Sequence, residues 1–110
     1  MTNYSLVFLE KENDLNKLLR EEKRNRHRKG ELALLYTSLW DDPSIKLVES
    51  LQDKYTVSEN STPLYIINNF TMPHAFVIFK TTKLPHLVKL KGDRVFSTDY
   101  LPEVHRKLGV

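Results

Sequence analysis

The most informative stretch of the sequence is Leu32-Ala33-Leu34-Leu35-Tyr36-Thr37-Ser38-Leu39-Trp40-Asp41-Asp42-Pro43-Ser44. Its first five residues are apolar, which is typical of a strand buried on both faces in the middle of a parallel sheet. Its last residues predict the start of a helix, because Asp41 or Asp42 can cap the first turn and Pro43 fits within it. Apolar residues then recur at helical spacing, so we expect this helix to end at about Tyr55.

Before this stretch the sequence predicts one strand and one helix. Residues 4–9 form a short run of apolar and β-forming residues, which indicates a buried strand. Leucines at helical spacing among charged residues then predict an amphipathic helix over residues 13–28. Asn13 or Asp14 can cap its start, and Gly30 follows its end.

After the second helix the sequence predicts three strands and a last helix. Strands are expected over residues 64–68, 75–79 and 87–90. The last two would pair as a hairpin around a loop at residues 80–85. Residues 98–108 are predicted to form the closing helix, in which Pro102 is tolerated because it lies in the first turn. The expected order is therefore β-α-β-α-β-β-β-α.

Length and composition set limits on what the chain can be. The 110 residues match the usual size of one domain, and no linker, repeat or low-complexity segment divides them, so residues 1–110 are expected to form a single domain. The longest apolar runs are far shorter than the roughly 20 residues that span a bilayer. The N-terminal residues also lack the basic and apolar segments of a secretory signal, so we expect no membrane helix and a cytoplasmic location.

The sequence contains no cysteine. This absence excludes disulfide bonds, thiolate metal sites, cysteine nucleophiles and dithiol redox chemistry. The formal net charge of +3 favours acidic partners, but it is too small to indicate a protein whose main role is to coat nucleic acid. Charge alone therefore assigns no function.

Two motifs stand at the ends of predicted elements: Trp40-Asp41-Asp42-Pro43-Ser44 opens a helix, and Thr71-Met72-Pro73-His74 precedes a strand. In this order they resemble the Trp-Cys-Gly-Pro-Cys and cis-proline motifs of the thioredoxin family. The resemblance covers most of the chain and implies an α/β, thioredoxin-like three-layer sandwich with a mixed central sheet of about five strands and flanking helices. It also implies that Met72-Pro73 is the cis-proline element. The helix usual before this proline is expected to be missing or very short, because only residues 69–72 separate the proline from the preceding strand.

The sequence departs from the family at the residues that carry its chemistry. Asp41 and Ser44 occupy the positions that match the two cysteines, and Leu35 occupies the position that matches a buried, proton-transferring Asp. A serine hydroxyl needs an adjacent base to become a nucleophile, and an ionised Asp cannot replace a thiolate in disulfide exchange. We therefore expect no dithiol oxidoreductase activity, no other enzymatic activity and no catalytic residues.

A scaffold kept without its chemistry indicates a redox-inactive module that binds a protein or an extended peptide. In the family, the residue before the cis-proline offers its backbone N–H and C=O to an extended peptide, a strand-addition contact that needs no thiol. The expected groove lies between the two matching loops and contains Trp40, Asp41, Asp42, Pro43, Ser44, Met72 and Pro73.

Each part of this groove also has a purely structural interpretation. Trp40 is either an exposed platform or a packing residue. Asp41 and Asp42 are more often helix caps than a catalytic pair, and their charge argues against a bound phosphate, so no cofactor is expected. Met72-Pro73 is either a peptide-binding element or only a turn. The sheet face left without a helix offers another surface for assembly or for a partner.

Two groups of basic residues support a different function, nucleic-acid binding. One group belongs to the end of the first helix: Arg20, Lys23, Arg24, Arg26, Arg28 and Lys29. The other accompanies the expected hairpin: Lys80, Lys83, Lys89, Lys91 and Arg94. If both groups face one side, they form a candidate nucleic-acid surface. Basic residues late in a helix also complement its dipole, and acidic proteins would attract the same charges.

The histidines do not predict a metal site. The four are His27, His74, His86 and His105, and they lack the spacing of a His-Glu-x-x-His motif or a thiolate pair to complete a tetrahedral site. In the expected hairpin, His74 and His86 would lie at opposite ends of the strand pair. No metal ion is therefore expected.

Overall fold

A computed structural model describes residues 4–24, 32–55, 62–68, 72–74, 76, 83–91, 94–100 and 102–110. The helices and strands within these residues are β1 (Tyr4–Phe8), α1 (Glu12–Arg24), β2 (Leu32–Thr37), α2 (Asp42–Lys54), β3 (Thr62–Asn68), β4 (His86–Lys91), β5 (Arg94–Asp99) and α4 (Glu103–Leu108). The described elements follow the order β-α-β-α-β-β-β-α, as expected, although the strands after β3 are not all the predicted ones. Of the helices in this part of the chain, none combines the length and apolar character that crossing a bilayer requires.

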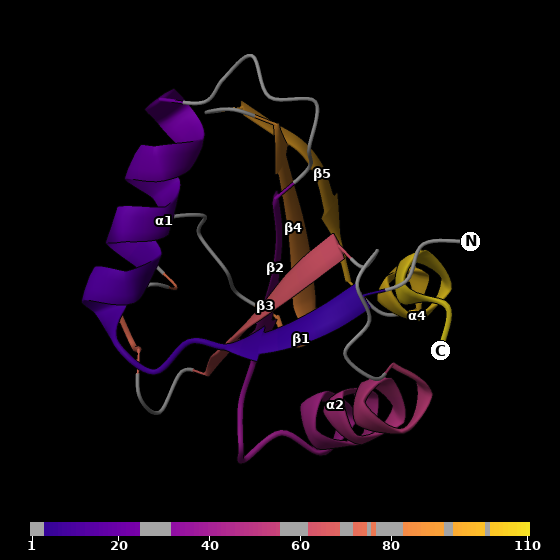
Figure 1. The fold of residues 1–110 in the computed structure, drawn as a ribbon. Helices are drawn as coiled ribbons and strands as arrows, with labels where there is room; N and C mark the ends of the chain where they lie inside the picture. The colour runs from indigo at the N-terminus through magenta and orange to yellow at the C-terminus, as the bar shows by residue number, and fades with distance from the viewer. Residues whose placement is uncertain are drawn as a thin grey trace.

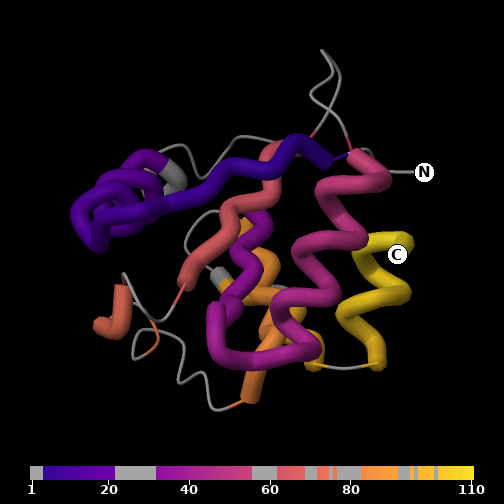
Figure 2. Tube along the Cα trace, turned by 90° about the horizontal axis from the view of Figure 1, so that it is seen from below, coloured from indigo at the N-terminus to yellow at the C-terminus, as the bar shows by residue number. Residues whose placement is uncertain are grey.

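The strands form one mixed sheet in the order β1-β3-β2-β4-β5. The strands β1, β3 and β2 run parallel, whereas β4 is antiparallel to β2 and β5 is antiparallel to β4. Helix α1 covers one face of the sheet, and α2 and α4 lie next to each other on the other face (Figures 1 and 2). This arrangement is the expected three-layer sandwich.

The strand β2 lies at the centre of the sheet and is buried along its whole length. Because side chains alternate along a strand, Leu34 and Tyr36 join the core under α1, while Ala33 and Leu35 join the core under α2 and α4. Leu35 makes no contact with water. Burial of one such leucine contributes roughly 1.5–3 kcal/mol, so this strand anchors both layers.

The start of α2 follows the sequence prediction closely. Asp41 is the N-cap, and its Oδ2 accepts hydrogen bonds from the backbone N–H of Ser44 at 3.1 Å and from the Ser44 hydroxyl at 2.7 Å. Pro43 lies in the first turn, where its missing N–H leaves no helical hydrogen bond unmade. The helix ends at Lys54, and Tyr55 is its C-cap, as expected.

The end of α2 is joined to the C-terminus of the chain. The Tyr55 hydroxyl donates a hydrogen bond of 2.7 Å to the carbonyl of Leu108, and Lys54 donates to the carbonyl of Gly109. The Tyr55 ring also packs edge-on against Tyr4 of β1, with 5.5 Å between ring centroids. These contacts join the end of α2 to the C-terminal residues that follow α4 and to the strand β1.

The segments after β3 differ from the prediction. Phe76 is helical, so the strand expected at residues 75–79 is wrong there, and the other residues of that segment lie outside the described part of the chain. The strand β5 was not predicted, and the closing helix begins at Glu103 instead of residue 98. A short apolar run does not distinguish a strand from a buried helix, and Phe76 is indeed packed edge-on against Tyr36 at 4.9 Å.

The assignment of the cis-proline element is also wrong. The cis peptide bond lies between Leu84 and Pro85, directly before β4, and not between Met72 and Pro73. The error follows from the misplaced strand, because the strand that comes after the cis-proline is β4. Met72 is fully buried in the core under α1, where Phe76 also packs, so a helical residue covers the part of the sheet that was expected to lack a helix.

A histidine lies buried where β4 meets β2. His86 stands opposite Tyr36 in the strand register, and its ring stacks on Tyr100 with 4.3 Å between centroids. Burial lowers the pKa of His86 from the usual 6.5, and the nearby charge of Asp99 opposes part of this effect. The folded state therefore favours the neutral imidazole.

Replacing the N-cap of α2 should destabilise the protein more than replacing its neighbour. We expect Asp41→Ala to lower the free energy of unfolding by about 1 kcal/mol or more, because the N–H and hydroxyl of Ser44 lose their acceptor. Asp42→Ala is the matched control: this exposed carboxylate contributes through the helix dipole, and its loss should cost less. Urea denaturation measures both, and equal losses would contradict the capping role.

The stability of the fold should depend on pH through His86. Because the pKa is lower in the folded than in the unfolded state, the stabilisation is complete above about pH 6.5 and declines as the pH falls toward the folded-state pKa. The slope should not exceed about 1.4 kcal/mol per pH unit. Urea denaturation from pH 5 to 8 should show this decline in the parent chain and in His74→Asn, an exposed control, but not in His86→Phe. An unchanged slope in His86→Phe would disprove the assignment.

Candidate functional site

The candidate site is the loop that leaves β2 and enters α2, residues 38–44, here called the Trp40 loop. It carries two large apolar side chains in solvent, with Trp40 80% and Leu39 64% exposed. Phe8, at the end of β1, is also about half exposed. A group of large apolar side chains that face water at the ends of the strands is a common mark of an interaction surface.

The backbone of the Trp40 loop is held in place by hydrogen bonds. The N–H of Trp40 donates to the Ser38 hydroxyl oxygen at 3.2 Å, and the N–H of Asp41 donates to the Ser38 carbonyl at 3.3 Å. Asp41 is in turn fixed as the cap of α2. The exposed indole therefore stands on an ordered support, which reduces the entropy that a partner must remove on binding.

Five of the seven predicted groove residues lie together in this loop. Asp42 and Pro43 are exposed, Asp41 is half-buried, and Ser44 is buried with its hydroxyl engaged by Asp41. The carboxylate that accepts from the Ser44 hydroxyl is the one that caps the helix.

Met72 and Pro73 lie elsewhere. Met72 is buried under α1, and the next residues reach the start of that helix, where the N–H of His74 donates to Glu12 Oε1 at 2.7 Å. The segment beside the Trp40 loop is instead Leu84-Pro85, because Tyr36 pairs with His86 and the chain before His86 runs alongside the end of β2. Pro85 is buried and Leu84 is half-buried.

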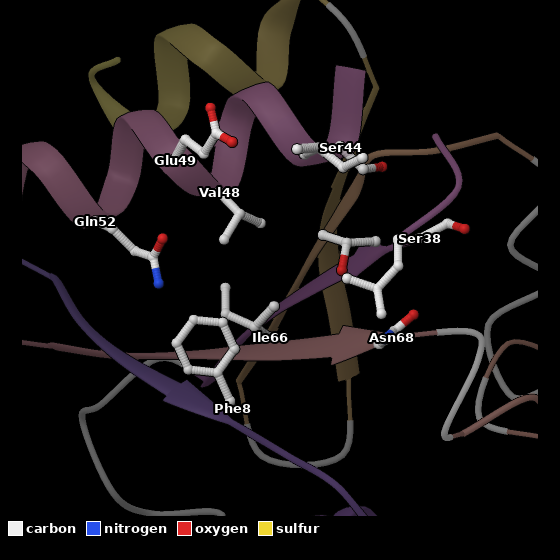
Figure 3. A pocket seen from close by; sticks show the side chains of 11 residues that line it. Phe8, Ser38, Ser44, Val48, Glu49, Gln52, Ile66 and Asn68 are labelled. Atoms are coloured by element: carbon white, nitrogen blue, oxygen red, sulfur yellow. The ribbon is translucent and has the colours of Figure 1, made fainter. Parts of the chain in front are cut away.

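A cavity of about 310 Å³ opens next to the Trp40 loop (Figure 3). It lies between α2 and the ends of the three parallel strands, and eleven residues line it: Phe8, Thr37, Ser38, Leu39, Ser44, Ile45, Val48, Glu49, Gln52, Ile66 and Asn68. Its walls are mostly apolar, and Val48 on α2 faces Ile66 on β3 in Figure 3. Sequence reasoning missed this cavity, although sites in open α/β sheets commonly lie at the carboxyl ends of parallel strands.

Several members of the two predicted basic groups lie away from the Trp40 loop, whereas the exposed Lys83 directly precedes Leu84-Pro85. Helix α1 carries Arg20, which is exposed, and β4 carries Lys89 and Lys91. The register pairs Leu32 with Leu90, so the chain enters β2 beside the basic end of β4 (Figure 1). Other members of the two predicted groups, Arg26, Arg28, Lys29 and Lys80, lie outside the described residues.

Comparisons with known proteins give the fold its context. No protein-family model matches the chain, and no curated protein matches it in sequence. Solved structures do match it over nearly its whole length. Thioredoxin NaTrxh from Nicotiana alata superposes with a TM-score of 0.72 at 11% identity, and the match covers 98% of this chain and 93% of that one.

Two animal thioredoxins are similarly close in structure. The thioredoxin of Fasciola hepatica has a TM-score of 0.67 at 13% identity, over 93% of this chain and 95% of that one. Schistosoma mansoni thioredoxin has a TM-score of 0.66 at 14% identity, over 96% and 94% of the two chains. Together with the sheet order and the position of the Trp40 loop, these matches show that the chain has a thioredoxin-like fold that lacks the active-site cysteines.

Proposed function

We propose that this chain is a redox-inactive, thioredoxin-fold module that binds a protein or an extended peptide at the Trp40 loop. The observation that carries the proposal is the exposure of Trp40 and Leu39 on an ordered backbone. Tryptophan is among the residues most enriched at the energetic centres of protein interfaces. The exposed Asp42 and Pro43 extend the same surface.

The redox-inactive part of the proposal follows from the chemistry of the loop. With no cysteine in the sequence, Asp41 and Ser44 stand where the fold family has thiols, and neither can exchange disulfides. Asp41 instead caps α2, and the Ser44 hydroxyl donates a hydrogen bond to the capping carboxylate. The loop therefore offers a shaped surface and no reacting group.

The second half of the groove needs revision. The side chain of Met72 is buried in the core under α1, and the chain after Pro73 reaches the start of α1, so we assign the second contact of the peptide to another segment. The Leu84-Pro85 segment, which lies beside the end of β2, is the better neighbour for a bound peptide. In this revised form the partner contacts Trp40, Asp42 and Pro43 first and reaches Leu84 second.

A second candidate, nucleic-acid binding, is favoured by the strand register at the far end of the molecule. The pairing of Leu32 with Leu90 places the start of β2 beside Lys89 and Lys91 of β4. The basic side chains of β4 would then face a nucleic-acid backbone, whose binding depends strongly on salt.

Partner binding should depend on Trp40. In a pull-down with purified chain, we expect Trp40→Ala to weaken partner capture by roughly 30-fold, the effect of losing about 2 kcal/mol at an interface centre. The control is Val95→Ala, which removes an exposed apolar side chain from β5, at the opposite edge of the sheet from β1. Capture that survives Trp40→Ala, or reduction of insulin disulfides by the chain, would contradict the proposal.

Nucleic-acid binding should be lost when the charge of the basic residues near the end of α1 is reversed. We expect the double variant Arg24→Glu with Arg26→Glu to abolish binding of DNA or RNA at low salt, and the affinity of the parent chain to fall steeply as salt rises. The matched control reverses two exposed lysines on the other face, Lys46→Glu with Lys107→Glu. A flat titration of the parent chain at low salt would remove this candidate.

A further inference from the structure

The cavity beside the Trp40 loop is continuous with the exposed apolar surface. Leu39 belongs to both, since it is 64% exposed and also lines the cavity. Phe8 stands at the other side of the opening and is half exposed, while Val48 and Ile66 form the inner walls (Figure 3). A volume of about 310 Å³ lies near the lower end of the range of ligand pockets, roughly 300–1,000 Å³, and is suited to one side chain or a small group.

Two of the three hydroxyls that line the cavity have committed their protons, while the Ser38 hydroxyl oxygen accepts from the N–H of Trp40. Thr37 Oγ1 donates to the carbonyl of Ile67 at 3.0 Å, and Ser44 Oγ donates to Asp41 Oδ2 at 2.7 Å. A hydroxyl has one proton to give and two lone pairs to accept with, so these two oxygens can only accept a further hydrogen bond. The Ser38 hydroxyl and the Gln52 and Asn68 amides also belong to the lining and carry donor groups, so hydrogen bonding alone selects no occupant.

The charge at the opening of the cavity favours a cationic group. Glu49 is the only charged residue among the eleven that line the cavity, and it is exposed on α2 next to Val48. An ionised glutamate accepts hydrogen bonds and attracts cations, so it favours Lys or Arg and disfavours an acidic group. The apolar walls thus favour an apolar group inside the cavity, and Glu49 favours a cationic group at its opening.

We infer that the cavity receives an apolar side chain of the partner peptide and that an adjacent Lys or Arg of this peptide pairs with Glu49. This inference rests on the proposed binding function and adds a sequence preference to it: an apolar residue followed by a basic one. Trp40 and Leu39 provide the broad contact, whereas the cavity and Glu49 provide the selection.

Short peptides test this preference directly. The probes are acetyl-Leu-Arg-amide, acetyl-Leu-Glu-amide and acetyl-Ser-Arg-amide, each titrated into the ¹⁵N-labelled chain and followed by NMR. We expect acetyl-Leu-Arg-amide to bind most tightly and to shift the amides of Val48, Glu49 and Ile66. Glu49→Gln should weaken this probe by about two- to five-fold, and Glu49→Lys should reverse the order of the Arg and Glu probes. Glu103→Gln, which changes an exposed glutamate of α4 outside the cavity lining, is the matched control and should leave the affinities unchanged.

The inference is overturned if the Arg and Glu probes bind equally, if acetyl-Ser-Arg-amide binds as well as acetyl-Leu-Arg-amide, or if the shifts map elsewhere. Its failure can be told apart from failure of the proposed function. Partner capture that depends on Trp40 but is unaffected by Glu49→Lys supports the module and rejects the cavity preference. Capture that survives Trp40→Ala rejects the module itself.

Discussion

Complete burial of β2 on both faces is the constraint on which the other layers depend. The strand supplies Leu34 and Tyr36 to the core under α1 and Leu35 to the core under α2 and α4, and it pairs with β3 on one side and β4 on the other. The helices pack over the positions where these side chains project from the two faces of the sheet. The end of β2 therefore fixes where the Trp40 loop emerges and which way it faces.

The elements that sequence reasoning found have strong local signals. An unbroken apolar run predicts a central strand such as β2, and the combination of Asp41 with Pro43 predicts the start of α2 because capping and the missing proline N–H act within one turn. The segment around Phe76 has no such signal, since its apolar run suits a strand or a buried helix equally. Its packing against Tyr36 involves residues far apart in sequence, and the error there displaced the cis-proline element as well.

The candidate site was predictable only where it is formed by one contiguous segment of the sequence. The Trp40 loop is one continuous segment, so its residues could be named together from the sequence. The cavity is built from three separate segments, represented by Phe8, Val48 and Ile66, and it exists only when β1, α2 and β3 are in place. The hydrogen bonds that leave Thr37 and Ser44 as acceptors depend on backbone and side-chain geometry that no spacing rule encodes.

The hydrogen bond between Ser44 and Asp41 limits the substitutions that the start of α2 can tolerate. Cysteines at these two positions would remove the carboxylate that accepts from the N–H and the hydroxyl of Ser44 at the start of α2. A substitution of Asp41 or Ser44 alone would also weaken the hydrogen bonds at the start of the helix. The start of α2 therefore depends on the same two side chains that a pair of thiols would have to replace.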